Sequence, residues 1–217
     1  TDRFPKVRAA TAGQARIVGI AKGAGMIEPN MATLLVFILT DAVIDKERLR
    51  ELHRDAIERS FNRISVDSDQ STSDMAILLS SGKKSVSSEE EFAGALASVY
   101  RDLAEDVVRN GEGTGHVIRT VVRGAPDTSV ATAIGKAIIN SPLVKTAAFG
   151  NDPNVGRVIM AIGDYAGNAG LELDPEAMVI SIGGEVVFRG GSFTLDAEKE
   201  KRIFDHMKEA QLKKKKG

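Results

Sequence analysis

Hydrophobic residues in this chain form two kinds of pattern, and the first has the length of β-strands. Apolar runs of about four to eight residues, bounded by Gly, Asn, Asp or Ser, are typical of strands. The most continuous is Leu-Leu-Val-Phe-Ile-Leu at residues 34–39. We predict strands at residues 14–21, 34–39, 75–79, 117–123 and 143–149, and a hairpin that joins 177–182 to 185–188 through Gly183-Gly184.

The second pattern places apolar residues three or four positions apart, as on one face of an α-helix. Asp45 can cap one such helix, and the capping box Ser88-Glu89-Glu90-Glu91 opens another that ends at Asn110-Gly111. We predict three more helices: residues 128–140, closed by Pro142; a helix with Asp152 as N-cap and Pro153 in its first position; and a final helix capped by Asp196.

Strands that alternate with helices predict an α/β protein. A two-residue connection such as Gly183-Gly184 can join only antiparallel strands. We therefore expect a mixed sheet that is at least partly antiparallel.

Composition and charge exclude several classes of function. The chain has 217 residues, a net charge of −1 and no cysteine. The charge argues against nucleic-acid binding, which depends on cationic contacts to phosphates. The missing cysteines exclude thiol catalysis, disulfides and cysteine-bound metals. No apolar run approaches the roughly 20 residues of a membrane span, so we expect a soluble, cytoplasmic protein without a membrane partner.

The stretch from Lys22 to Ala42 carries the candidate chemistry. A Gly-rich segment leads to Ala32, and Thr33 then opens the apolar run. A hydroxyl at the entry to a buried strand can act as a nucleophile. If it attacks the preceding carbonyl, an N-to-O acyl shift and hydrolysis cut the chain. The new α-amine, with a pKa of roughly 7.7 to 8.0, can then serve as the base, which leaves His53, His116 and His206 without a catalytic role.

The same stretch resembles the self-cleavage junction of the ornithine acetyltransferase (glutamate N-acetyltransferase, ArgJ) family. The shared pattern is Lys-Gly-x-Gly-Met-Ile-x-Pro-Asn-Met-Ala, followed by the nucleophilic Thr. The resemblance implies the layered fold of that family and autoproteolysis between Ala32 and Thr33. It also implies transfer of an acetyl group from N2-acetyl-L-ornithine to L-glutamate through an acetyl-threonine, in arginine biosynthesis. Some relatives also use acetyl-CoA as donor.

The resemblance assigns two further substrate-binding residues. Lys22, eleven residues before Thr33, matches the family's substrate lysine, and a cation there suits an amino-acid carboxylate. Glu112, in Asn-Gly-Glu-Gly-Thr-Gly, matches a glutamate that contacts substrate, and a carboxylate suits the substrate amino group. No metal and no cofactor is implied.

Two other motifs receive no catalytic role. Residues 65–74 begin like a calcium loop, but Thr72 and Leu78 stand where Gly and Glu are required. We interpret this stretch as a turn in which Asp and Ser side chains bond the backbone. Residues 151–157 resemble a family motif with Val155 in place of Trp. We also expect His53 to be a surface residue.

In family terms, residues 1–32 are the end of the α part and residues 33–217 belong to the β chain. The resemblance places an oxyanion Thr-Gly pair before residue 1, and an Asn and a Thr of the substrate site after residue 217. It implies a heterotetramer of two α and two β chains. Two alternatives remain open: an amidase or aminopeptidase of the same self-cleaving fold, and an inactive fragment with a scaffold role.

Overall fold

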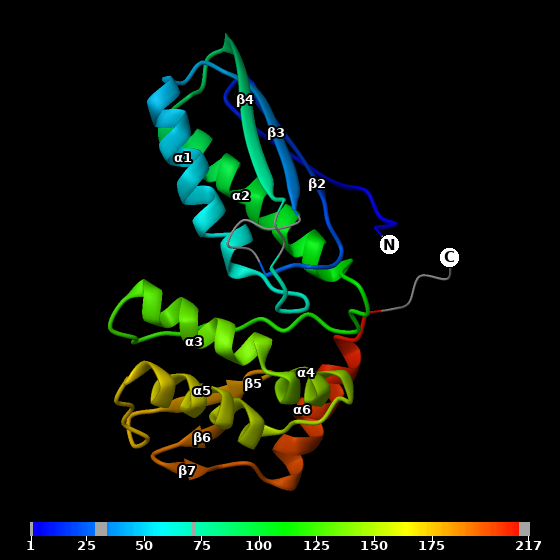
Figure 1. Cartoon of the computed structure of the whole chain (residues 1–217), viewed down its shortest axis with the longest axis vertical. Helices are drawn as coiled ribbons and strands as arrows, with labels where there is room; N and C mark the ends of the chain where they lie inside the picture. Colours follow the sequence, from blue (N-terminus) through cyan, green and yellow to red (C-terminus); the bar gives the residue numbers. More distant parts are fainter. Residues whose placement is uncertain (1, 29–33, 71–72, 213–217) are drawn as a thin grey trace. The chain divides into compact units, whose positions relative to one another are not determined.

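A computed structural model of the chain describes residues 2–28, 34–70 and 73–212 (Figure 1). The chain packs into two compact units, residues 1–114 and 115–217. The predicted cleavage boundary between residues 32 and 33 lies outside the described ranges, so the division into 1–32 and 33–217 stays a prediction. No helix in those ranges is long and apolar enough to cross a membrane.

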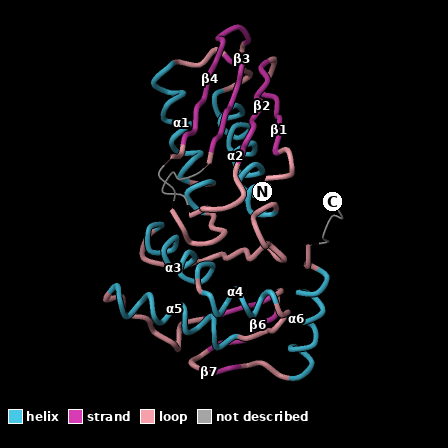
Figure 2. Tube along the Cα trace, turned by 45° about the vertical axis from the view of Figure 1, so that its right-hand side comes forward, coloured by secondary structure: helices cyan, strands magenta, loops and turns pink. Residues whose placement is uncertain are grey.

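In its described part, the first unit contains a four-stranded sheet. β1 (Lys6–Ala12) and β2 (Ala15–Lys22) pair antiparallel, as do β2 and β3 (Leu35–Ala42), whereas β3 and β4 (Met75–Lys84) pair parallel. The expected mixed sheet and the strands predicted at 14–21, 34–39 and 75–79 are confirmed, while the hydrophobic pattern does not predict β1. The strands lie side by side in the order β1, β2, β3 and β4 (Figure 2).

Helices α1 (Lys46–Glu58) and α2 (Glu89–Arg109) cover one face of this sheet. α1 connects β3 to β4, because parallel neighbours need a crossover, and a short 3₁₀ turn (Phe61–Arg63) follows it. Both predicted N-caps are confirmed. Asp45 accepts hydrogen bonds from the first turn of α1, and Ser88 accepts one from Glu91 N at 3.1 Å.

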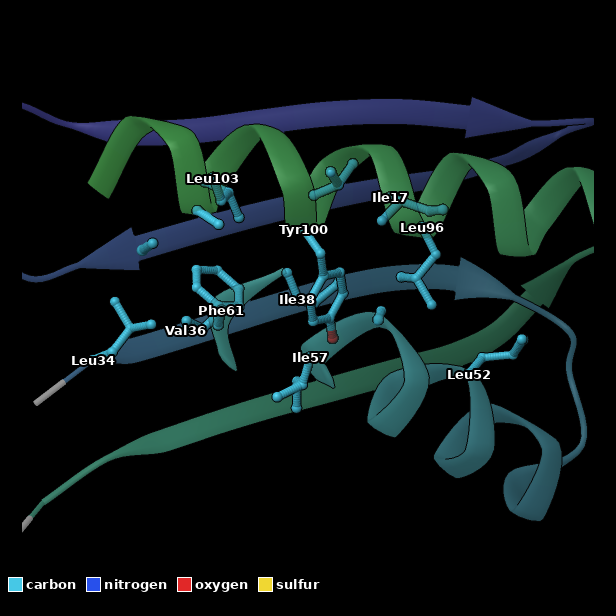
Figure 3. Packing of buried hydrophobic residues seen from close by; sticks show 14 of the residues in the cluster. Ile17, Leu34, Val36, Ile38, Leu52, Ile57, Phe61, Leu96, Tyr100 and Leu103 are labelled. Carbon is cyan, nitrogen blue, oxygen red and sulfur yellow. The ribbon is translucent and has the colours of Figure 1, made fainter. Parts of the chain in front are cut away.

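The core of the first unit lies between these helices and the sheet. Ile17, Val36 and Ile38 alternate with exposed residues along the strands and are fully buried against Leu96 and Leu103 (Figure 3). Full burial of each large aliphatic side chain stabilises the fold by about 1.5–3 kcal/mol. This layer therefore fixes where the ends of the strands lie.

Gly19, in the middle of β2, allows α2 to approach the sheet closely. A Cβ at this position would lie 2.6 Å from Leu103 Cδ1 and 2.7 Å from Val99 Cγ1. Real Cβ atoms do not come so close to side-chain carbons in a packed interior. The helix and strand are thus spaced for glycine at this crossing.

The other face of the sheet is apolar and exposed. Ile20, Phe37, Leu39 and Leu79 are between 37% and 56% exposed. The register joins them into two rows across the strands: Val7, Ile20, Phe37 and Ile77 in one, and Val18, Leu39 and Leu79 in the other. A contiguous hydrophobic surface of this kind is typical of an interaction face.

The second unit combines helices with a small antiparallel sheet. The predicted helix at 128–140, the hairpin and the final helix capped by Asp196 are confirmed. In the described residues, two apolar clusters form its core, one around Ile134 and Ile138 and the other around Val187 and Ile203. Its elements are α3 (Thr128–Asn140), α4 (Pro142–Phe149), α5 (Val155–Ala169), β5 (Val179–Ile182), β6 (Glu185–Arg189), β7 (Ser192–Phe193) and α6 (Ala197–Glu209).

Two of the predicted strands are wrong. Residues 143–149 belong to the helix α4, because Pro142 occupies its first turn and Ser141 Oγ accepts from Val144 N at 3.3 Å. A short apolar run can be a strand or a buried helix, and the cap decides between them here. Residues 117–123 form no strand, since a strand needs a ladder partner and the described residues supply none. Ile118 and Val122 pack instead against the cluster around Ile134.

Two single-residue predictions are also wrong. The N-cap of α5 is Asn154, not Asp152, because Asn154 Oδ1 accepts from Arg157 N at 3.3 Å and the helix begins at Val155. His53 is half-buried rather than a surface residue. Its Nε2–H donates to Ala76 O at 3.2 Å, and Nδ1 pairs with the hydroxyl of Tyr100.

The close contact at Gly19 predicts that Gly19→Ala destabilises the first unit. We expect a loss of about 1–3 kcal/mol from overpacking, measured by urea denaturation. Gly94→Ala is the matched control, because Gly94 lies on the exposed side of α2 with nothing within 4 Å of its would-be Cβ. That control should gain up to about 1 kcal/mol. Equal unfolding midpoints for Gly19→Ala and the unsubstituted chain would contradict this account of the packing.

The environment of His53 predicts a pH-dependent stability. Burial lowers the pKa of His53, only partly opposed by its bond to Ala76. Below a pH of about 6.5 the unfolded chain therefore binds a proton that the folded chain does not. The free energy of unfolding should fall as pH drops from about 7.5 towards the lowered pKa. His53→Gln should flatten this slope, and identical slopes in the two proteins would refute the assignment.

Candidate active site

The connection between β2 and β3 contains the predicted junction. Residues 23–28 are described, and Leu34 is buried at the entry to β3. The predicted nucleophile Thr33 and its partner in the scissile bond, Ala32, lie outside the described residues. Their roles therefore stay predictions, and the surrounding residues define the geometry.

Lys22 ends β2 at the same edge of the sheet at which β3 begins. The antiparallel register places Lys22 opposite Leu35, two residues after Thr33. Its side chain is exposed. The predicted substrate lysine thus lies beside the strand that Thr33 precedes, although its contact with a substrate stays a prediction.

Asp2 anchors the first residue of the connection. Its carboxylate accepts from Lys6 Nζ at 2.5 Å and from Gly23 N at 2.9 Å. Burial works against its ionisation, but these hydrogen bonds and the charge of Lys6 hold the pKa of Asp2 below its usual value. Because the Lys6 side chain is fully buried, this ion pair gives it the partner that a buried charge requires.

Asp67 holds the next part of the connection. Its two oxygens accept from Met26 N at 2.7 Å and from Ile27 N at 2.9 Å, and Val66 N donates to Ile27 O at 2.7 Å. Met26 has φ of 54°, a left-handed conformation that is uncommon outside glycine. The carboxylate therefore stabilises a strained turn on the approach to the junction.

Glu112 adjoins the same turn. Its N–H donates to Ala24 O at 2.7 Å. A Cβ at Gly25 would lie 2.8 Å from Glu112 Oε2, so glycine there leaves room for the carboxylate. The structure thus brings the predicted substrate glutamate to the segment that begins at Lys22, 90 residues earlier in the chain; binding of substrate by Glu112 stays a prediction.

Asp74 holds the far side of the junction. Leu34 N donates to Asp74 Oδ1 at 2.6 Å, and Met75 N donates to Leu34 O at 3.0 Å. Burial raises the pKa of Asp74, partly opposed by the bond from Leu34. Its second oxygen, Oδ2, is buried and receives no hydrogen bond from the described residues.

Sequence reasoning misses the role of Asp67 and Asp74. Their carboxylates do bond backbone N–H groups, as expected for residues 65–74, but they bond those on either side of the junction. A signal was present, because Asp74 directly precedes the strand beginning at Met75 just as Thr33 directly precedes the apolar run. Parallel pairing of the two strands would have placed the residues that enter them, Leu34 and Asp74, together.

Comparison of the chain with models of known protein families identifies its family. The model of the ArgJ family matches residues 1–215. The chain is a member of the ArgJ family. This confirms the resemblance found in the junction motif and extends it over almost the whole chain.

Curated ArgJ relatives agree with this assignment. The "Arginine biosynthesis bifunctional protein ArgJ 2" of Nostoc sp. is 44% identical over 208 residues, which are 96% of this chain and 53% of that protein. The "Glutamate N-acetyltransferase Oat2" of Streptomyces clavuligerus is 44% identical over 188 residues, 87% of this chain and 47% of that protein. The chain thus spans about half the length of the curated relatives it matches.

A solved structure agrees as well. The crystal structure of the arginine biosynthesis bifunctional protein ArgJ from Bacillus halodurans is similar with a TM-score of 0.72 and 36% identity. The similarity covers 80% of this chain and 82% of that one. The expected α/β fold of the ArgJ family is therefore confirmed.

The second unit of this ArgJ family member holds a cavity of about 700 Å³. Residues 116–126, β5 and apolar side chains of α3 and α4 line it, and neither Lys22 nor Glu112 does. The nearby 151–157 motif has structural contacts. Val155 is buried, and Arg157 Nη1 donates to Leu143 O and to Thr146 Oγ1, both at 2.9 Å. Valine in place of the family tryptophan is thus accommodated in the core.

The contacts of Asp67 predict that Asp67→Ala loosens the approach to the junction. Loss of two charge-assisted hydrogen bonds should cost about 1.5–3 kcal/mol locally and speed amide exchange at Ile27, measured by hydrogen–deuterium exchange. Asp69→Ala is the matched control, an exposed carboxylate of the same loop whose main-chain N–H, kept in the variant, bonds Asp67. Unchanged exchange at Ile27 in Asp67→Ala would show that the bonds do not hold this turn.

Proposed function

We propose that this chain carries the nucleophile-bearing half of an ornithine acetyltransferase. In this proposal it moves an acetyl group from N2-acetyl-L-ornithine to L-glutamate through an acetyl-Thr33 intermediate. The observation that carries the proposal is the junction itself: backbone groups on both sides of residues 29–33 are held by carboxylates of one loop, with Lys22 and Glu112 adjoining. The names of the relatives, arginine biosynthesis protein and glutamate N-acetyltransferase, support it.

The first proposed step is autoproteolysis between Ala32 and Thr33. The Thr33 hydroxyl attacks the Ala32 carbonyl carbon, the C–N bond breaks, and an ester joins the two parts. Water then hydrolyses the ester, which frees the Ala32 carboxylate and restores the hydroxyl. The Thr33 nitrogen becomes a free α-amine, whose ordinary pKa of roughly 7.7 to 8.0 suits a general base near neutral pH.

The second proposed step is acetyl transfer. The α-amine takes the hydroxyl proton as Thr33 Oγ attacks the acetyl carbonyl, and the proton then passes to the departing nitrogen of ornithine. Glutamate enters the same site, and its amine takes the acetyl group from Oγ. One site can serve both because donor and acceptor share an α-carbon framework with a carboxylate, for which Lys22 is the proposed anchor. This order of events is ping-pong.

The exposed apolar face of the first sheet supports assembly with further polypeptide. Rows of large hydrophobic side chains, including Phe37 and Leu39, are exposed in this chain, and the curated relatives are about twice as long as the matched region. We propose that the remaining α segment covers this face, and that the cleaved enzyme is a heterotetramer of two α and two β chains in the cytoplasm.

Two alternatives differ from this proposal in what happens to the acyl group. In an amidase or aminopeptidase of the same fold, water accepts it, and an inactive scaffold forms no acyl intermediate. The transferase name of the Streptomyces relative favours transfer. Product analysis with and without glutamate separates transfer from hydrolysis, and the same assay with acetyl-CoA tests whether it is a second donor.

We predict that acetylornithine alone labels Thr33. In a protein of the relatives' full length that contains this sequence, the peptide beginning at Thr33 should gain one acetyl group, about 42 Da, because the intermediate accumulates when no acceptor is present. Peptide mass spectrometry measures the adduct. Thr33→Ala should abolish both cleavage and labelling, and Thr33→Ser should retain part of each.

The Lys22→Ala variant tests the proposed contact between Lys22 and the substrate carboxylate. It should raise KM for acetylornithine more than it lowers kcat, since it removes a contact to the substrate carboxylate and leaves the nucleophile intact. A label on another residue, or turnover in Thr33→Ala, would refute the nucleophile. If Lys22→Ala lowers kcat and leaves KM unchanged, the proposed role of Lys22 is refuted.

A further inference from the structure

Residues 117–123 have the pattern of a strand but no strand beside them. From Ile118 to Arg123, partly buried and exposed side chains alternate, which is the period of an extended strand with one face on a core. No described strand pairs with this segment, and the backbone of residues 120–123 makes no hydrogen bond to another described residue. A partly buried backbone in this state lacks the partners that its N–H and C=O groups require.

The strand β5 has an unpaired edge in the same unit. The small sheet has the order β5-β6-β7, so β5 pairs with β6 on one side and with no described strand on the other. We call this second side the free edge of β5. A free edge presents a row of N–H and C=O groups on which another strand can pair.

The segment and β5 pack on the same layer of helices. Ile118 and Val122 of the segment, and Ile180 of β5, all contact one apolar cluster. Helices α3, α4 and α5 supply this cluster through Ile134, Ile138, Val144, Ala161 and Ile162. Residues 117–123 and β5 therefore lie against the helices in the way that strands of one sheet do.

The cavity of about 700 Å³ in the second unit adjoins both of them. Residues 116–126 and 177–183 line it, and the helices contribute apolar side chains that include Ile134, Ile138 and Val158. An extended peptide in this cavity could pair with backbone groups of the segment and of β5 while its side chains pack on the helices. A small molecule would leave most of those backbone groups without partners.

We propose that this cavity takes one further β-strand, which pairs with residues 117–123 and with the free edge of β5 and joins them in one sheet. The occupant is a segment of the same protein that follows this chain in the full-length sequence. This inference goes beyond acetyl transfer and does not depend on Thr33.

Two observations favour this occupant. The curated relatives are about twice as long as the region they share with this chain, so further polypeptide exists to fill the cavity. Leu212 N donates to Gly115 O at 2.8 Å. The end of the described chain is therefore bonded, backbone to backbone, just before residues 117–123, where a following strand would have to begin.

Hydrogen exchange resolved to single residues tests the added strand. It compares the 217-residue chain with a protein of the relatives' full length that contains this sequence. In the longer protein, every second amide of residues 117–123 should exchange more slowly by about a hundredfold or more, because a strand turns alternate N–H groups towards each neighbour. Amides on the free edge of β5 should slow as well. Phe188, which pairs with both β5 and β7, is the internal reference and should not change.

The pattern of slowed amides distinguishes the occupants. Alternate slowing in residues 117–123 together with slowing on the free edge of β5 supports the inserted strand. Uniform slowing, slowing of only one of the two edges, or equal exchange in the two proteins would overturn it. Slowing that already occurs in the 217-residue chain and grows with its concentration would assign the edge to a second copy, which would also overturn the proposal.

A shortened protein tests where the strand comes from. In the full-length protein ended after residue 217, the alternate slowing of residues 117–123 should be lost while Phe188 stays protected. Slowing that persists would place the occupant before residue 1 and contradict the assignment. If circular dichroism shows that the shortened protein is poorly folded, peptides of about ten residues from the sequence after residue 217 are added to the 217-residue chain. One of them should restore the alternate slowing and its scrambled version should not; failure of every peptide would overturn the assignment.

These outcomes are separate from those of the proposed function. Thr33→Ala, which should abolish cleavage and labelling, should leave the exchange of residues 117–123 in the full-length protein unchanged. If Thr33→Ala abolishes the acetyl adduct but residues 117–123 exchange equally in the long and short proteins, the nucleophile stands and the added strand is wrong. The opposite pair of results would leave the strand and remove the nucleophile.

Discussion

The parallel pairing of β3 and β4 is the constraint on which the candidate site depends. α1 crosses from the end of one strand to the start of the other, so both strands begin at the same edge of the sheet. Leu35 pairs with Met75, and the residues that enter the two strands, Leu34 and Asp74, are therefore neighbours. An antiparallel arrangement would have placed Asp74 at the opposite edge, about 20 Å away for strands of six residues.

A loop with a strained residue can present a reacting bond only if other elements hold it. Here Asp2, which precedes β1, and Asp67 and Asp74, which share the loop before β4, bind backbone N–H groups along the β2–β3 connection. Each contact is charge-assisted, and such bonds are roughly twice as strong as neutral ones. The cost of a left-handed Met26 is thus offset by contacts made on both sides of the junction.

The two faces of the first sheet differ in what covers them. One is covered by α1 and α2 so closely that Gly19 cannot carry a Cβ without a clash. The other exposes rows of apolar side chains such as Phe37 and Leu39. The strand that follows the proposed nucleophile in the chain, β3, therefore has a rigid layer on one side and an exposed apolar surface on the other.

The sequence by itself determined the elements whose signals are local. Caps at Asp45, Ser88 and Asp196 start helices through bonds to the following turn, and the continuous apolar run marks β3. Tertiary structure decided what depends on a partner distant in sequence. Residues 117–123 have strand-like composition but no ladder partner among the described residues, and the roles of Asp67 and Asp74 exist only because folding brings their loop to the junction. A carboxylate's donors are set by its neighbours in space, and no local pattern records them.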